Sequence, residues 1–484
     1  MDLSLLIAGY AEQHHHRGWP RQRMLHECLR AAIRSGTLAA GTRLAASRAL
    51  AEELGLARNT VLYAYEQLAS EGFVTTDRRG TVVATIAADR KPSPSPQVST
   101  QARLAQRARG LRALPGPAEM MGAFVPGVPA LDHFPLTLWR RMLERAWRSL
   151  TVAQLNYGDP AGEPTLRAAI ADHLRAARGA QCGMEQIFIT SGTQSSLDLC
   201  ARAFADAGDK AWIENPGYGG ASAALRGAQL KVVGIATDAD GIHPSASDWR
   251  RHRPKLIYTT PSHQYPTGSV LTLERRLDLI ARARSAGALV IEDDYDSEFR
   301  HDGPPLPAMQ GLAPDAPVVY LGTFSKTMFP ALRLGFMVVP QALAEPLEAV
   351  LARSAPAGRT AEQLALAQFL RGGQFALHLR RMRRLYKQRR DALVSALETH
   401  LGHAGTVHGG SAGMHLAFQL ADPRRDDRLL SEAARKLGIV APALRDHATG
   451  ARANGWNGFL LGYAQVPADK MDALVRTLAR SMGY

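Results

Sequence analysis

This sequence predicts two folded units of different class: a small N-terminal unit, mainly α-helical with one β hairpin, and a large α/β unit with a mostly parallel sheet. Three helical patterns and a hairpin pattern occupy the first 86 residues. Beyond residue 117, short β-rich runs alternate with helical stretches, which favours parallel strands joined by helices. The clearest of these runs are residues 186–190, 256–260, 288–292 and 318–322.

The two units are separated by a stretch in which proline alternates with small or charged residues, from Lys91 to Pro96. Proline fixes φ and lacks an N–H group, so this segment should be extended and semi-rigid. Polar, arginine-rich sequence continues to about Arg112. We therefore expect an N-terminal domain over residues 1–86, a linker over residues 87–117 and the large domain over residues 118–484.

The overall composition limits the class of protein. Hydrophobic residues make up 46% of the chain, which is typical of a soluble protein with a sizeable core. No apolar run is long enough for a transmembrane helix, and the first ten residues lack the features of a signal peptide. The three scattered cysteines favour a reducing cytoplasm over a disulfide framework or zinc site. We expect a cytoplasmic protein with no metal site and no membrane contact.

Positive charge is concentrated in two places. The formal net charge is +14, and residues 1–110 hold 15 Lys and Arg against 9 Asp and Glu. A basic N-terminal unit is suited to nucleic acid. A second basic run lies between Arg371 and Arg390. For this second run a solvated helix face is the favoured interpretation and a DNA contact is the alternative.

The N-terminal unit has the pattern of a helix-turn-helix followed by a hairpin. Helices are predicted over residues 21–35, 48–54 and about 59–70, with Ser47 capping the second. The tight turn at residues 54–57 joins the second and third helices. Strands at residues 73–76 and 81–84 flank a basic turn, which makes the hairpin a candidate wing.

Residues 39–48, 57–61 and 65–68 resemble the winged helix-turn-helix domain of the GntR family, although Ala45 replaces the usual proline and the wing is short. The resemblance implies that the third helix enters the major groove of double-stranded DNA, while the wing reaches the minor groove. The implied DNA contacts are Arg43, Arg48, Arg58, Asn59, Thr60, Arg78 and Arg79. A helical interaction domain with a solvated basic face is the simpler alternative.

Three motifs in the large unit carry chemistry. The segment Thr323-Phe324-Ser325-Lys326 is followed by Arg333, and an upstream strand ends in the acidic residues 292–294. A third segment, residues 190–194, is a Gly/Ser/Thr turn that opens a helix. Such a turn can bind phosphate, because free N–H groups and the helix dipole favour an anion. Each motif is weak evidence alone; their order and spacing give them weight.

Together these motifs resemble the fold-type I, class I aminotransferase domain over residues 118–484. The resemblance implies a pyridoxal 5′-phosphate (PLP) transferase fold, with a mostly parallel large domain and a smaller α+β domain. It implies that Lys326 forms a Schiff base with PLP, Asp293 pairs with the pyridinium nitrogen and Tyr295 donates to O3′. It further implies a phosphate cradle and a stacking tyrosine, formed by Gly192, Thr193, Thr323, Arg333 and Tyr218, with Tyr157 reaching in from a partner subunit. Singly, these residues could be half-buried tyrosines, a helix cap or a surface cation.

Two positions depart from the aminotransferase pattern. Tyr265 stands where these enzymes place an asparagine that helps to hold O3′. Leu460 stands where they place the arginine that clamps the substrate carboxylate with its planar fork. Arg445 and Arg452 lie near enough in sequence to substitute for that arginine.

The combination of both units resembles the MocR/GabR family of regulators. This implies a PLP-dependent transcription regulator, a homodimer whose N-terminal domains cross to the partner subunit, and an operator in double-stranded DNA. Its effector would be PLP, an amine or an amino acid acting at Lys326. Leu460 modestly favours sensing of PLP itself, in control of vitamin B6 synthesis. The alternatives are an active class I aminotransferase with an accessory DNA-binding domain, and a DNA-binding protein whose body binds no PLP. As a regulator, it would carry out at most a residual transaminase half-reaction.

Overall fold

The computed structural model describes residues 10, 19–78, 80–85, 105–109, 121–303, 306–354, 358–449 and 455–484. The chain divides into two compact units, residues 1–103 and 104–484. This division falls within the segment expected to be a linker, whose boundaries remain a prediction. Within that segment the short helix α5 (Gln106–Arg109) is described.

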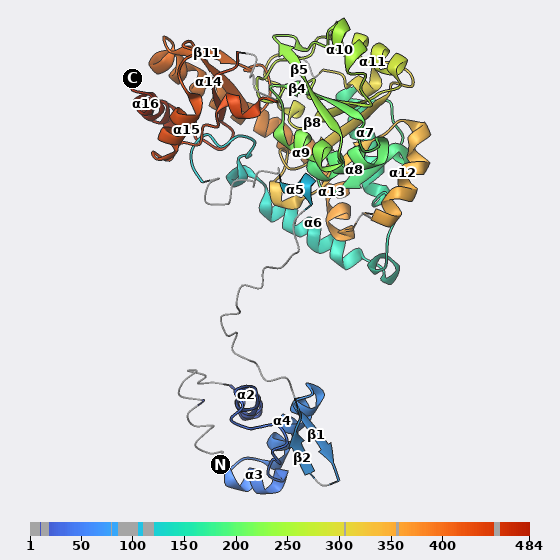
Figure 1. The fold of residues 1–484 in the computed structure, drawn as a ribbon, viewed down its shortest axis with the longest axis vertical. Helices are drawn as coiled ribbons and strands as arrows, with labels where there is room; N and C mark the ends of the chain where they lie inside the picture. The colour runs from blue at the N-terminus through green and yellow to red at the C-terminus, as the bar shows by residue number, and fades with distance from the viewer. Residues whose placement is uncertain are drawn as a thin grey trace. The chain divides into compact units, whose positions relative to one another are not determined.

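Within the residues that the structure describes, the N-terminal unit contains three bounded helices and one antiparallel hairpin (Figure 1). Its elements are α2 (Arg21–Arg34), α3 (Ser47–Glu53), α4 (Arg58–Ser70), β1 (Val74–Asp77) and β2 (Gly80–Val83). Leu25, Leu29, Leu50, Val61 and Leu68 form the centre of its core. The predicted elements are confirmed to within two residues, but the predicted cap is wrong. Ser47 is the first residue of α3 rather than its cap, and its hydroxyl instead accepts a bond from Arg58 Nε at 3.5 Å.

The C-terminal unit is built on an eight-stranded sheet in the order β3-β10-β9-β8-β7-β4-β5-β6. The strands are β3 (Ile187–Thr190), β4 (Lys210–Asn215), β5 (Lys231–Asp238), β6 (Gly241–Ile242), β7 (Leu256–Thr259), β8 (Leu289–Asp294), β9 (Val318–Thr323) and β10 (Gly335–Val338). Neighbours from β9 to β5 pair in parallel, whereas β10 is antiparallel to both β9 and β3. The central strands are buried along their whole length, as expected for a parallel sheet covered on both faces.

Helices cover this sheet, and a smaller α+β domain lies at one end of the unit (Figure 1). The large domain contains α6 (Leu136–Ser149), α7 (Pro164–Arg178), α8 (Thr193–Phe204), α9 (Gly219–Gly227), α10 (Ala246–Arg251), α11 (Leu273–Ala286), α12 (Gln341–Ser354) and α13 (Thr360–Arg371). The smaller domain contains α14 (Gln374–Leu401), α15 (Asp427–Arg435), α16 (Met471–Ser481) and the antiparallel strands β11 (Gly405–His408), β12 (His415–Leu420) and β13 (Gly458–Gly462). The predicted fold is confirmed. None of the described helices is long and apolar enough to span a membrane.

The parallel strands determine where a site can form. The carboxyl ends of β7, β8 and β9 lie at the same edge of the sheet, because adjacent parallel strands run in the same direction. Asp293 lies opposite Leu321 in this register, and Lys326 follows β9 after two residues. The fold therefore brings together motifs that lie far apart in sequence.

Candidate functional site

Lys326 lies in the turn after β9, with its amine enclosed by the protein. Its Nζ donates a hydrogen bond to the carbonyl oxygen of Gly127 at 2.7 Å. Burial lowers the pKa of this amine, while the carboxylates of Asp296 and Asp293 oppose that change. Burial thus favours the neutral amine, which is the nucleophilic form needed to attack a carbonyl carbon.

Asp293 lies in β8 with one carboxylate oxygen engaged and the other free. Its Oδ2 accepts from the hydroxyl of Tyr258 at 2.7 Å. Its Oδ1 is buried and has no hydrogen-bond partner among the described residues. Burial raises the pKa of Asp293 to about 7, although the bond from Tyr258 acts in the opposite direction. A buried acceptor without a protein partner is suited to a ligand N–H group, and the pyridinium of PLP would supply one.

The raised pKa of Asp293 makes the stability of the cofactor-free protein depend on pH. The ordinary value is 3.8, so the carboxyl destabilises the fold increasingly as pH rises from 3.8 to about 7. We expect Asp293→Asn to remove this cost. Its advantage in free energy of unfolding over the parent should grow by about 2–3 kcal/mol between pH 5 and pH 8, at 1.36 kcal/mol per pH unit. Urea unfolding at both pH values measures this, and a pH-independent difference would contradict it.

The residues expected to form a phosphate cradle lie where three segments approach one another closely. Gly192 precedes α8 with φ +104°, and a Cβ there would lie 3.7 Å from Nη1 of Arg333. Gly335 pairs with Thr323 in β9, and a Cβ on Gly335 would lie 2.8 Å from the Cα of Gly192. Thr193 is the first residue of α8. The structure thus brings these residues to the helix N-terminus, where N–H groups and a guanidinium favour an anion.

Tyr218 and Tyr265 meet on another side of the site. Tyr218 precedes α9, and its ring centroid lies 5.6 Å from that of Tyr265 in a T-shaped contact. The ring of Tyr265 also lies 5.2 Å from His447, 5.4 Å from His415 and 6.1 Å from Tyr295. The position taken by asparagine in aminotransferases is therefore filled by a phenol packed among aromatic rings.

Tyr157 is not brought into the site within its own chain. Its side chain is 97% exposed, and its backbone N–H donates to the side chain of Asn156. The expected contact of Tyr157 with a phosphate in a second copy of the chain remains a prediction.

The position of the missing clamp arginine is apolar. Leu460 lies in β13, fully buried with Ala417 and Leu444, and Tyr265 packs against this cluster. Arg445 does not replace the arginine, because its Nη2 donates to the carbonyl of Pro423 at 2.8 Å and its Nε lies 3.6 Å from buried Asp427. Arg452 lies outside the described residues. Among the described residues, the apolar cluster around Leu460 therefore offers a carboxylate no charged partner.

Sequence reasoning missed several residues that shape the site. Gly127 and Tyr258 contact Lys326 and Asp293 but lie in segments without a recognisable motif. His263 lies two residues before Tyr265 and Asp296 directly after Tyr295, and the sequence predicts no role for either. These two residues and His415 each bring one potential ligand atom to within 4.8 Å of the others. A hydrogen bond already joins His263 to Asp296, so we interpret the group as a histidine–carboxylate pair beside a second imidazole.

Gly127 offers a test of how tightly Lys326 is enclosed. Its φ is +71°, and a Cβ would lie 2.6 Å from the lysine Nζ. We expect Gly127→Ala to displace the Lys326 amine in addition to straining the backbone, and so to weaken retention of the expected PLP about tenfold, or about 1.4 kcal/mol. Absorbance after gel filtration measures retention. Gly287→Ala, at φ +67° with open space around it, is the matched control. Equal retention by the two variants would contradict the expectation.

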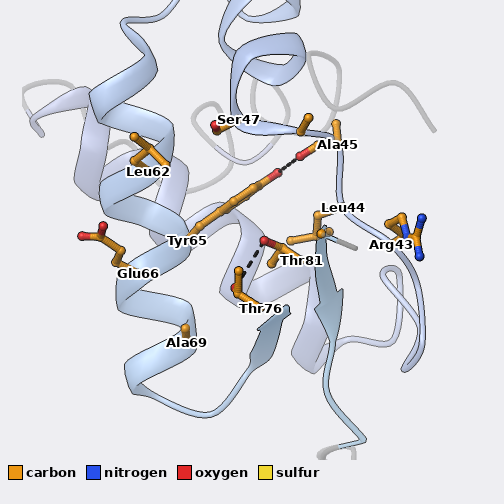
Figure 2. Close-up of a pocket in the computed structure, with 12 residues that line it drawn as sticks. Arg43, Leu44, Ala45, Ser47, Leu62, Tyr65, Glu66, Ala69, Thr76 and Thr81 are labelled. Atoms are coloured by element: carbon orange, nitrogen blue, oxygen red, sulfur yellow. Dashed lines mark hydrogen bonds between the residues drawn. The ribbon is translucent and has the colours of Figure 1, made fainter. Parts of the chain in front are cut away.

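The predicted DNA contacts lie mainly on the exposed surface of the N-terminal unit. Thr60 is half-buried, Arg79 lies outside the described residues, and the exposed side chains are Arg43, Arg48, Arg58, Asn59 and Arg78. A cavity of about 530 Å³ lies between α4 and the hairpin. Beside it the Tyr65 hydroxyl donates to the carbonyl of Ala45 at 2.9 Å, a bond drawn in Figure 2. This bond holds the segment that carries Arg43 against α4.

The second basic run lies on α14, apart from Arg371 at the end of α13, and is divided between two roles. Arg383, Arg389 and Arg390 donate to backbone carbonyls within the C-terminal unit, from Glu298, Ala464 and Gly410. Arg380, Arg381 and Arg384 are exposed. Three of the eight basic residues of the run therefore stabilise the fold, and the exposed arginines form a solvated face.

Comparison with known proteins places both units in families. Residues 128–478 match "Aminotransferase class I and II", and residues 21–83 match "Bacterial regulatory proteins, gntR family". The probable rhizopine catabolism regulatory protein MocR of Rhizobium meliloti is 39% identical over 465 residues, covering 95% of this chain and 93% of that protein. The pyridoxine biosynthesis transcriptional regulator PdxR of Corynebacterium glutamicum is 32% identical over 452 residues, covering 92% of each. Kynurenine aminotransferase of Pyrococcus horikoshii, solved with PMP, matches 78% of this chain and 96% of its own with a TM-score of 0.70 and 26% identity.

Proposed function

Because this chain belongs to the MocR-type transcription regulators, in which a gntR-family domain is joined to a class I and II aminotransferase domain, we propose that its C-terminal unit binds PLP and uses it to control operator binding. The observation that carries the proposal is the free Oδ1 of buried Asp293, in a site that also holds the enclosed amine of Lys326. The proposed organisation is a DNA-binding domain over residues 1–86, a linker over residues 87–117 and an effector domain over residues 118–484. The protein would act in the cytoplasm.

The residues of the site fit the cofactor group by group. Lys326 would hold PLP covalently, Asp293 would keep a proton on the ring nitrogen and Tyr295 would donate to O3′. Tyr218 would stack on the ring, and the phosphate would be held by Gly192, Thr193, Thr323, Arg333 and Tyr157 of the partner subunit. Bound PLP supplies an electron-withdrawing ring and a carbonyl-derived carbon open to attack by amines.

The apolar surroundings of Leu460 support an effector without a carboxylate. PLP itself meets that condition, and the relative PdxR is named for pyridoxine biosynthesis. We therefore favour control of vitamin B6 synthesis over sensing of an ordinary α-amino acid. An effector that is an amine carrying a sulfonate, or another amine, is the alternative. Because Leu460 replaces the clamp arginine, we expect at most a half-reaction of transamination.

The proposal is tested by operator binding of the dimer. Each N-terminal domain would cross to the partner subunit, and PLP would shift the separation of the two domains. Such coupling requires the effector to bind two states of the protein with different affinity. We expect PLP to change the affinity of the cofactor-free protein for its upstream DNA by about 5–150-fold. Unchanged affinity and DNA bending would overturn the coupling, and robust turnover without specific DNA binding would favour the enzyme.

Arg58 tests the DNA-binding face separately. It begins α4 and is exposed, so its guanidinium can reach a phosphate or a guanine. We expect Arg58→Ala to weaken operator binding by about 1–3 kcal/mol, with PLP absorbance unchanged. Arg202→Ala, in a surface ion pair with Asp198 on α8, is the matched control for loss of one positive charge. Equal weakening in both variants would show that net charge, and not position, matters.

A further inference from the structure

We propose that His263 and Asp296 form a buried positioning pair that orients the hydroxyl of Tyr295, a role that rests on the proposed binding of PLP at Lys326. His263 follows β7, and Asp296 follows β8 directly after Tyr295. Neither residue matches a position with a role in the aminotransferase pattern.

His263 contacts both the carboxylate of Asp296 and the hydroxyl of Tyr295. His263 Nδ1 lies 3.1 Å from Oδ2 and 3.2 Å from Oδ1 of Asp296, and each side chain is 1% exposed. The Tyr295 hydroxyl donates to the carbonyl oxygen of His263 at 2.9 Å and lies 3.2 Å from its Nδ1. Both the backbone and the ring of His263 thus border the atom that would face O3′ of the cofactor. The carboxylate of Asp296 accepts a hydrogen bond from the Nδ1–H group of His263 and so fixes the orientation of the ring.

The surrounding backbone leaves space for this pair. Gly413 has φ +81°, and a Cβ there would lie 2.2 Å from Nδ1 of His263 and 2.5 Å from Oδ2 of Asp296. The ring of His415 packs on His263 with centroids 4.6 Å apart. Gly413 and His415, which both belong to the small domain, thus contact the pair. A movement of the small domain would therefore displace His263 and, with it, the Tyr295 hydroxyl.

The charge of Asp296 acts on both reactive groups of the site. Burial raises the pKa of Tyr295 well above its usual value, and Asp296 is the first carboxylate that adds to this change. The phenol therefore stays protonated, and its single O–H, which donates to the His263 carbonyl in this structure, would turn to donate to a ring oxygen. Asp296 is also the first carboxylate that opposes the lowering of the Lys326 pKa. A carboxylate that influences the hydroxyl and the amine together is placed to tune the electronic state of a bound cofactor.

The test is the visible absorbance spectrum and PLP affinity of four variants of the full chain: Asp296→Asn, Tyr295→Phe, the double variant, and His263→Asn. We expect Asp296→Asn to shift the absorbance maximum and weaken PLP binding about tenfold, as loss of a hydrogen bond to a charged group implies. His263→Asn keeps a donor near Nδ1 and should retain most of the parent behaviour. Because the pair acts mainly through Tyr295, the double variant should differ less from Tyr295→Phe than Asp296→Asn differs from the parent.

Each outcome supports or overturns a specific claim. Additive effects in the double variant would overturn positioning through Tyr295, as would a parent-like spectrum for Asp296→Asn. If Asp296→Asn does not fold, His263→Phe replaces it in the same cycle, and a parent-like spectrum there overturns the proposal. A parent protein that shows no visible band with PLP would instead refute the proposed function, which separates the two failures.

Discussion

Replacing Lys326 with alanine is expected to abolish the visible absorbance that PLP gives to the protein, and with it the response of operator binding to PLP. The amine is held by the Gly127 carbonyl and lies near the carboxylates of Asp296 and Asp293. Alanine would remove the proposed covalent attachment and leave Asp293 and the proposed phosphate cradle in place. We expect PLP retention to fall at least 100-fold, or about 2.7 kcal/mol, while basal DNA affinity stays unchanged.

The control for Lys326→Ala is Lys387→Ala, a half-exposed lysine of α14 that pairs with Asp302 at the surface. Absorbance after gel filtration and operator titration with PLP are the measurements. A Lys326→Ala protein that keeps both the band and the DNA response would contradict the assignment. A parent protein that never shows the band would favour a body that binds no PLP.

The proximity of Lys326 and Asp293 could be predicted because it follows from strand order. Asp293 lies near the end of β8 and Lys326 follows β9, and these two adjacent strands are parallel. Motifs at their carboxyl ends therefore meet at the same edge of the sheet. The partner of each residue could not be predicted in this way. Gly127 precedes α6 and Tyr258 lies in β7, and only the register of the sheet and the path of the N-terminal segment bring them to the site.

The wall around Leu460 shows a different limit of the sequence. The leucine itself revealed that the clamp arginine is absent, but Arg445 remained a possible substitute because it lies nearby in sequence. The structure excludes Arg445 as a substitute, because other groups already bind its guanidinium. Buried Asp427 accepts from the backbone of Arg445 and lies close to its guanidinium, which turns the side chain toward the carbonyls before α15. Such competition depends on tertiary contacts that no local motif encodes.

Breaking the ion pair beneath the site should cause the largest loss of stability. Arg178 Nη2 lies 2.7 Å from Oδ2 of Asp294 and donates to Ser262 Oγ at 2.8 Å. The two charged side chains are 3% and 2% exposed. Arg178→Met would leave Asp294 with the hydroxyl of Tyr320 as its remaining side-chain donor among the described residues. We expect this to cost about 3–5 kcal/mol, because a buried charge without its counter-ion is strongly destabilising.

Urea unfolding of the cofactor-free protein, followed by tryptophan fluorescence, measures the loss, since five of the six tryptophans lie in the C-terminal unit. Arg282→Met, which breaks the exposed pair with Asp278, is the matched control and should cost under about 1 kcal/mol. The double variant Arg178→Met, Asp294→Leu should be more stable than Arg178→Met alone, because it removes the uncompensated charge. If the single and double variants lose the same free energy, the cost arises from the bonds that Arg178 makes to Ser262 and to the Leu306 carbonyl. In that case Arg178 stabilises the unit by holding the segments after β7 and β8 together, and its charge contributes little.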